Sequence, residues 1–143
     1  MGELLQNIVK KSPWIYRINA GSCNGCDVEM ATTALIPRYD VERLGCRYCG
    51  SPKHADIVLI SGPVTAVVKD KVLRVYDEIP NPKVVVAVGI CPISGGVFRE
   101  SYSIANQLDA YIPVDVNVPG CPPRPQAIID GIAMAIEIWR KKF

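Results

Sequence analysis

Two nearly continuous apolar runs, at residues 55–62 and 83–89, constrain the fold more than any other feature of this sequence. Each run has the length of a strand, is rich in Val, Ile or Leu, and ends in a glycine. A strand that is apolar on both sides is typical of a parallel sheet with both faces covered. The two runs therefore predict an α/β fold, with helices on both faces of a mostly parallel sheet.

The segments around these runs alternate between strand and helix patterns. Aromatic and β-branched residues predict a strand at 14–19, and Pro113 places another strand, at 111–118, at an edge of the sheet. The remaining expectations are helices at 27–35, 66–78 (capped by Thr65) and 103–108, a strand or turn at 38–49, and a glycine-rich loop at 94–96. A last helix is expected at 126–141, because these apolar residues share one helical face: Ile128, Ile132, Ala135 and Trp139.

The 143 residues fit a single domain, 1–143, with its own core. The net charge is only +2, and the Lys and Arg residues are scattered, which argues against a nucleic-acid partner. No apolar run approaches the roughly 18 residues that span a bilayer, so no direct membrane span is expected. The start of the chain is amphipathic, with Leu4, Leu5 and Ile8 on one side, and lacks the features of a secretory signal. We expect residues 1–12 to be an N-terminal interaction segment.

Six cysteines occur as two C-x-x-C pairs and two single residues, which favours metal or redox chemistry over a disulfide framework. One pair and both single cysteines follow three predicted strands. Function in parallel α/β sheets lies beyond the carboxyl ends of the strands. Four thiolates gathered at that edge would hold an iron–sulfur cluster, and the four are Cys23, Cys26, Cys91 and Cys121.

A zinc site is the alternative that the spacing leaves open. The two pairs, Cys23/Cys26 and Cys46/Cys49, fit the general C-x2-C-x(15–20)-C-x2-C zinc pattern. This interpretation leaves Cys91 and Cys121 as free thiols on loops rich in Gly and Pro, where a cysteine has no packing role. The spacing therefore favours an iron–sulfur cluster over a zinc-stabilised interaction module.

Four motifs together resemble a known family: GSCNGCDVE at 21–29, SPKHADIVLISGPVT at 51–65, GICPISGG at 89–96 and VPGCPPRP at 118–125. The series is similar to the small electron-transfer subunit of NiFe hydrogenases and to its counterpart in respiratory complex I. It most resembles the short small subunits of membrane-bound group 4 hydrogenases and of related ferredoxin-oxidising, sulfur-reducing complexes of archaea. Complex I homologues usually carry adjacent cysteines in the first motif, whereas this chain has C-x-x-C, as hydrogenases do.

The resemblance implies a flavodoxin-like fold without a flavin, and one 4Fe-4S cluster bound by Cys23, Cys26, Cys91 and Cys121. It implies an electron-transfer subunit of an oxidoreductase that is not catalytic alone. Electrons would pass from a ferredoxin-like iron–sulfur subunit to a large catalytic subunit, or to quinone in a complex I-type module. Membrane subunits of the same complex would hold the chain at the cytoplasmic side of the cell membrane, as a peripheral subunit.

Cys46 and Cys49 depart from the family pattern. They could form a disulfide, take part in a second metal site, or be unused thiols, and we favour a disulfide or free thiols. Glu29 lies three residues after Cys26, so the two share a helical face. It is either a favourable charge near a helix start or, as the resemblance implies, a proton-path carboxylate beside the cluster.

Three further parts of the sequence carry weaker signals. The segment Arg38, Tyr39 and Asp40 resembles the part of this family that faces the large subunit. His54 is the only histidine, and we expect a structural role for it rather than metal ligation. Arg124 could donate to a cluster sulfur or to a partner carboxylate, and the sequence does not decide between these.

Overall fold

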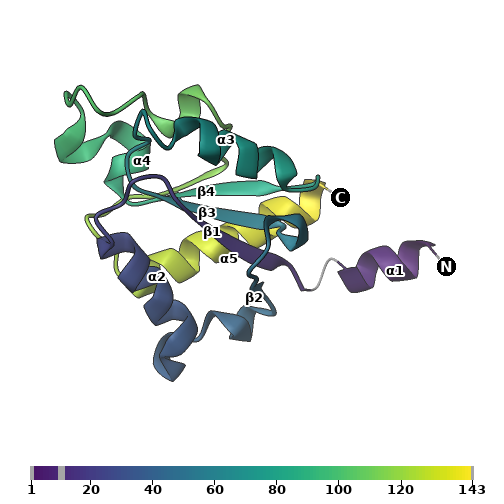
Figure 1. The fold of residues 1–143 in the computed structure, drawn as a ribbon. Coiled ribbons are helices and arrows are strands. Elements are labelled where there is room, and N and C mark those ends of the chain that lie inside the picture. The colour runs from purple at the N-terminus through teal and green to yellow at the C-terminus, as the bar shows by residue number, and fades with distance from the viewer. Residues whose placement is uncertain (1, 10–11, 143) are drawn as a thin grey trace.

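The computed structural model describes residues 2–9 and 12–142 and contains one sheet of five parallel strands (Figure 1). The strand order is β2-β1-β3-β4-β5, which is the doubly wound order of flavodoxin-like folds. The predicted α/β class and the flavodoxin-like topology are therefore confirmed. The strands are β1 (Trp14–Asn19), β2 (Arg47–Tyr48), β3 (Ile57–Ser61), β4 (Val84–Val88) and β5 (Val116–Val118).

Helices cover both faces of the sheet, as the two apolar runs predict. α2 (Gly25–Leu35) and α5 (Pro125–Lys142) lie on one face, and α3 (Lys69–Glu78) and α4 (Ile90–Ser94) on the other (Figure 1). Every residue of β3 and β4 is buried. Alternate side chains of these strands enter two separate cores, because successive strand residues point to opposite faces.

α5 packs its apolar stripe onto the sheet as expected. Ile128, Ile132, Ala135 and Trp139 are all fully buried. The Trp139 ring also donates from Nε1 to the Pro82 carbonyl at 3.1 Å, so its polar atom is satisfied.

Two other predicted helices begin at residues different from those predicted. α3 begins at Lys69 rather than at residue 66, and the Thr65 side chain does not cap it. Thr65 is instead held by its backbone, which pairs with Ile104 in an isolated antiparallel bridge and donates to the Ala20 carbonyl. The helix predicted at 27–35 begins earlier, at Gly25, so it includes Cys26.

The helix predicted at 103–108 is wrong. The Ser103 carbonyl accepts from Ala66 N, and Ala105 N donates to the Val64 carbonyl, so this backbone pairs with the segment before α3. Those bonds compete with the intrahelical bonds that a helix would need. The strand predicted at 111–118 shortens to Val116–Val118, at the edge of the sheet, because Pro113 cannot donate to a ladder.

Short 3-10 helices fill several connections. Those in the 37–44 region precede β2, so the prediction of a short strand or turn at 38–49 is confirmed. Ser94 ends α4, and the expected glycine-rich loop continues directly into another 3-10 turn. The 3-10 helices are Pro37–Tyr39, Val41–Leu44, Pro52–His54, Gly96–Phe98 and Leu108–Ala110.

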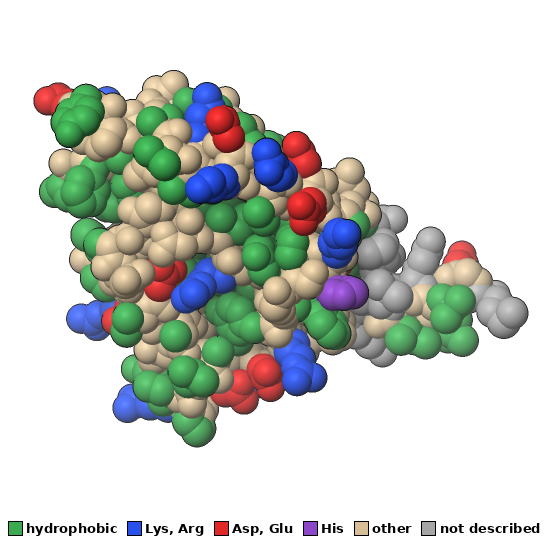
Figure 2. Space-filling view, viewed as in Figure 1, with side chains coloured by type: hydrophobic (Ala, Val, Ile, Leu, Met, Phe, Trp, Pro, Cys, Tyr) green, Lys and Arg blue, Asp and Glu red, His purple; other side chains and the backbone are tan. Residues whose placement is uncertain are grey.

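The first helix, α1 (Gly2–Val9), projects away from the body of the molecule (Figure 1). Its apolar residues Leu4, Leu5 and Ile8 are exposed and form a hydrophobic side of the helix (Figure 2). Met1, Lys10 and Lys11, which belong to the predicted segment 1–12, lie outside the described residues. Within the described ranges, no helix combines the length and hydropathy needed to cross a bilayer.

Candidate iron–sulfur site

The strands that precede the candidate cysteines end level with one another. Their pairing places Asn19 of β1 beside Ser61 of β3, Ser61 beside Val88 of β4, and Val88 beside Val118 of β5. The strands are parallel, so the loops that follow all leave from the same edge of the sheet. We call this edge, with its thiols Cys23, Cys26, Cys91 and Cys121, the cysteine edge.

Each cysteine has a different local setting at this edge. Cys23 and Cys121 are exposed on loops, the latter joined to Pro122 by a cis peptide bond. Cys26 is the second residue of α2 and is only 8% exposed. Cys91 is half-buried in α4, a single helical turn rather than the loop that the sequence suggested. Two of the four sulfurs therefore come from helices and two from loops.

The thiols of the cysteine edge affect one another's ionisation. Burial raises the pKa of Cys26 to about 11, and the charges of Cys91, Cys23 and Cys121, then of Asp27, contribute to the same rise. The pKa of Cys91 is raised by burial and then by the charges of Cys121 and Cys23. Four thiolates so placed repel one another. A positively charged metal centre would remove this cost, because coordination deprotonates thiols outright.

Three of the sulfurs lie close to the backbone of glycines. A Cβ added at Gly89 would lie 2.6 Å from Cys26 Sγ, and Gly89 has a positive φ of 93° that disfavours other residues. An added Cβ would lie 3.5 Å from Cys91 Sγ at Gly96 and 3.6 Å from Cys23 Sγ at Gly25. A site built only of thiols and faced by glycines fits an iron–sulfur cluster, whose usual ligands are four cysteines.

The same geometry does not fit one metal ion. Among the described residues, no group of three or more His, Cys, Asp or Glu side chains is placed to hold a single ion. Each thiolate around a 4Fe-4S cluster binds a different iron, so the sulfurs stand farther apart than around zinc. A cluster site therefore need not bring three thiols close enough to hold a single ion.

The zinc pairing of the two C-x-x-C motifs is wrong, because β2 pairs with the start of β1. Tyr48 lies beside Ile15, whereas Cys23 follows the far end of β1, about 15 Å along the strand. Cys46 and Cys49, which flank β2, therefore lie away from the cysteine edge.

We favoured either a disulfide or free thiols for Cys46 and Cys49, and the disulfide is wrong, since both are free thiols. They are three residues apart across a strand, so they point to opposite faces and join different cores. Cys46 Sγ donates to the Val41 carbonyl at 3.2 Å and Cys49 Sγ to the Ser51 carbonyl at 3.4 Å. The alternative of free thiols is the one that the structure supports.

Glu29 lies one turn after Cys26 in α2 and is half-buried. One open depression of about 540 Å³ is lined by Arg38, Tyr39 and Arg124, which come from two separate parts of the sequence. Asp40 instead accepts from Glu42 N at 3.0 Å, where it caps a 3-10 helix.

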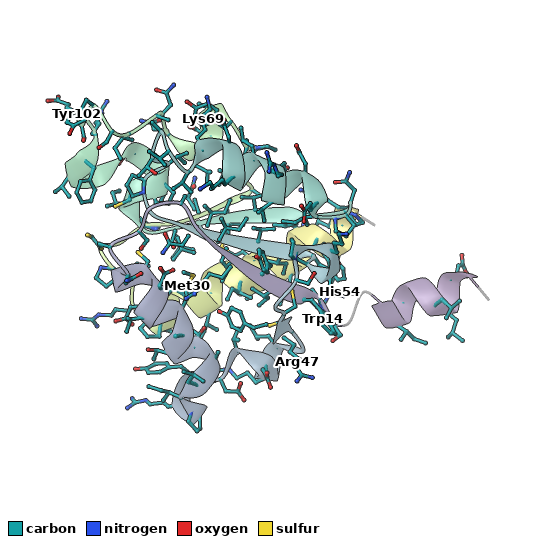
Figure 3. The ribbon with its side chains drawn as sticks, viewed as in Figure 1. Trp14, Met30, Arg47, His54, Lys69 and Tyr102 are labelled. Atoms are coloured by element: carbon teal, nitrogen blue, oxygen red, sulfur yellow. The ribbon has the colours of Figure 1, made fainter. Side chains whose placement is uncertain are left out.

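His54 lies away from the candidate ligands. Its ring centroid is 6.0 Å from that of Trp14 at the start of β1. Figure 3 shows the two side by side near Arg47, at the opposite end of the sheet from the cysteine edge.

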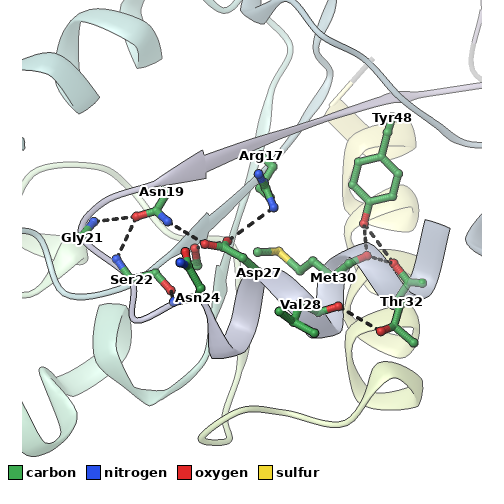
Figure 4. A network of polar contacts seen from close by, with 12 residues as sticks. Arg17, Asn19, Gly21, Ser22, Asn24, Asp27, Val28, Met30, Thr32 and Tyr48 are labelled. Carbon is green, nitrogen blue, oxygen red and sulfur yellow. Dashed lines mark hydrogen bonds and ion pairs between the residues drawn. The ribbon is translucent and has the colours of Figure 1, made fainter. Parts of the chain in front are cut away.

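A polar network not predicted from the sequence lies at the base of the loop that carries Cys23, which we call the cysteine loop (Figure 4). Asp27 is buried and accepts hydrogen bonds from Asn19 and Ser61. Asn19 in turn accepts from the backbone of Gly21 and Ser22. The available signal was an Asn directly before a Gly-Ser turn, since Asn side chains often bond to backbone two residues on.

Comparison with known proteins places this site in a family context. A probable membrane-bound hydrogenase subunit of Pyrococcus furiosus is 53% identical over 133 residues, which cover 93% of this chain and 79% of that protein. Formate hydrogenlyase subunit 7 of Escherichia coli is 42% identical over 94% of this chain, which spans about half (52%) of its length.

A solved structure agrees in fold as well as in sequence. A chain of the membrane-bound sulfane sulfur reductase, an archaeal respiratory membrane complex, superposes with a TM-score of 0.82 at 40% identity. The match covers 99% of this chain and 77% of that one. The family model described as NADH ubiquinone oxidoreductase, 20 Kd subunit, matches residues 23–135, which include all four thiols of the cysteine edge. The chain therefore belongs to the family of the 20 kDa subunit of NADH ubiquinone oxidoreductase.

Proposed function

We propose that this chain is an electron-transfer subunit that holds one 4Fe-4S cluster at the cysteine edge. The ligands are Cys23, Cys26, Cys91 and Cys121. The observation that carries the proposal is that these thiols follow three parallel strand ends to one edge of the sheet, where glycines lie against three of the sulfurs. When bound, the cluster supplies a site that takes up and releases single electrons.

The protein's own residues orient and shield that site. α2 holds Cys26 in a buried position, and its N-terminal turn favours the negative charge of a bound thiolate. Cys23 and Cys121 remain exposed, so the site is open on one side. An open side is where a redox partner can approach.

The proposed partners follow from the relatives, whose names describe subunits of membrane-bound hydrogenase and respiratory complexes. The donor is a ferredoxin-like iron–sulfur subunit, and the acceptor is a large catalytic subunit that reduces protons or sulfur compounds. Membrane subunits hold the chain peripherally at the cytoplasmic side of the membrane. Residues 1–12, with the exposed apolar side of α1, are an interaction segment within that assembly.

A quinone-reducing module is the second candidate, favoured by the complex I family model that matches residues 23–135. The first motif, Cys23-x-x-Cys26, favours the hydrogenase-type assignment instead, because complex I homologues usually have adjacent cysteines there. The large-subunit partner distinguishes the two, since only a hydrogenase partner carries paired C-x-x-C motifs for nickel and iron.

The cluster is tested by the metal content of the anaerobically purified chain. We expect about four irons per chain and a brown protein. Cys91→Ser should lose iron, because it removes one ligand of the cysteine edge. Zinc at one per chain without iron would overturn the proposal.

A double substitution supplies the matched control. Cys46→Ser with Cys49→Ser changes two cysteines that lie in the cores and away from the cysteine edge. Iron content and the EPR signal should match those of the unmodified chain. Iron loss equal to that of Cys91→Ser would mean that the wrong four ligands were assigned.

A further inference from the structure

A buried carboxylate stands directly behind the cysteine loop. Asp27 is the third residue of α2 and is only 6% exposed. Burying a carboxylate is costly unless it is hydrogen-bonded. Asp27 Oδ2 accepts from Asn19 Nδ2 at 2.6 Å, and Oδ1 accepts from Ser61 Oγ at 2.8 Å (Figure 4).

Asn19 connects this carboxylate to the loop that carries Cys23. Asn19 Oδ1 accepts from Gly21 N at 2.9 Å and from Ser22 N at 2.8 Å. These two bonds fix which side of the amide is oxygen, so its nitrogen must face Asp27. The amide cannot flip without breaking all three bonds.

The network is anchored to two neighbouring strands of the sheet. Asn19 ends β1 and Ser61, fully buried, ends β3, and the two are paired neighbours in the sheet. Arg17 Nη1 lies 3.8 Å from Asp27 Oδ1 and partly balances its charge. The carboxylate thus joins two strand ends to the first turn of α2, which contains Cys26.

We propose that Asp27 is a positioning residue that acts through Asn19 to hold the loop of Cys23 and the first turn of α2 in the geometry that retains the cluster. This inference rests on the proposed function, since it concerns retention of that cluster. Cys23 directly follows Ser22, whose N–H group donates to Asn19, and Cys26 directly precedes Asp27. Partners of metal ligands typically contribute in this way, by orienting the ligands that bind the metal.

The test uses the full chain with its cluster and measures the rate at which a chelator removes iron, together with the EPR spectrum of the reduced cluster. Asp27→Ala should lose iron at least about tenfold faster, the lower range for losing such a partner. Asn19→Asp should do the same, because it sets one carboxylate against another. Both should also broaden the EPR signal, which a general loss of fold stability would not do in protein that still holds its cluster.

The exchange variant N19D/D27N tests the bond itself. The carboxylate introduced at position 19 would accept from the two backbone N–H groups and from the amide introduced at position 27, whose oxygen can still accept from Ser61. Every hydrogen bond and the net charge are restored, so iron retention should return to within about twofold of the unmodified chain, as expected for directly coupled residues. Because this variant keeps the polar groups satisfied, it remains informative if Asp27→Ala does not fold.

Asp56→Ala is the matched control. Asp56 Oδ2 accepts from Trp14 N at 2.8 Å, so it also ties two segments of this sheet together, but at the opposite edge. Asp56→Ala should leave the iron-loss rate unchanged. Equal rates in Asp27→Ala and Asp56→Ala, or an exchange variant as impaired as Asn19→Asp, would overturn the inference and leave the proposed function intact. An unmodified chain that takes up no iron would overturn both.

Discussion

At the scale of single residues, Glu29 is the carboxylate whose position suggests a role in proton movement. It follows Cys26 by one turn on the same side of α2, and it is half-buried. We propose that this carboxylate takes part in the proton movement that accompanies electron transfer in the assembled complex.

Replacing this carboxylate separates proton transfer from structure. Glu29→Gln keeps the size and hydrogen bonding of the side chain but cannot carry the proton. We expect normal iron content and a fall in the turnover of the assembled complex by about tenfold or more. Glu137→Gln, on the exposed side of α5, is the control and should not change turnover. Full turnover in Glu29→Gln would mean that the carboxylate is only a favourable charge near a helix start.

The buried thiol of Cys46 predicts a pH dependence of stability. Burial raises its pKa from 9.0 to about 11, and the residue is 2% exposed. Its contribution to stability is complete below pH 9 and is lost as pH rises toward 11, because only the unfolded thiol ionises in that window. Compared with Cys46→Ala, the unmodified chain should lose roughly 2–3 kcal/mol more free energy of unfolding across this range. Denaturant titrations of both proteins at a series of pH values measure this difference. The prediction is contradicted if the free energy of unfolding of the two proteins falls in parallel with pH.

At the scale of elements, the close approach of α5 to β5 depends on one glycine. A Cβ added at Gly131 would collide with a methyl group of Val118, the last residue of β5. Gly131→Ala gains helix propensity of up to about 1 kcal/mol, but overpacking typically costs about 1–3 kcal/mol. We expect a net loss of about 1 kcal/mol in the free energy of unfolding, measured by denaturant titration.

Met134→Ala provides the comparison within the same helix. Met134 is exposed on α5, so its truncation should change stability by no more than about 0.5 kcal/mol. An increase in stability in Gly131→Ala would show that β5 can move aside, and that the spacing between α5 and β5 is less constrained than the contact with Val118 implies.

At the scale of the whole molecule, the chain should be a subunit that cannot turn over alone. An electron relay needs a donor and an acceptor, and the site proposed here accounts for one cluster and no substrate. The isolated chain should therefore show no hydrogen or sulfur turnover with artificial electron donors, in assays where the assembled complex is active. Turnover by the isolated chain would contradict this role.

The local sequence was enough to predict the sheet and the candidate ligands. Uninterrupted apolar runs at 55–62 and 83–89 imply parallel strands covered on both sides, and parallel strands bring their carboxyl ends together. Cys91 follows the second run, and the other candidate ligands follow the predicted strands at 14–19 and 111–118, so all four are expected at one edge of the sheet. These strands can be predicted from the sequence because their pattern of apolar residues is local.

Only the tertiary structure determined where the other cysteines lie and which groups the polar side chains and backbone bond to. The pairing of β2 with the start of β1 separates Cys46 and Cys49 from the cysteine edge and from each other. Likewise, bonds between 64–66 and 103–105 replace a predicted helix, and Asp27 meets Ser61 across 34 residues. The physical reason is that a hydrogen bond or a strand register between distant segments depends on how the chain closes between them, which no local pattern encodes.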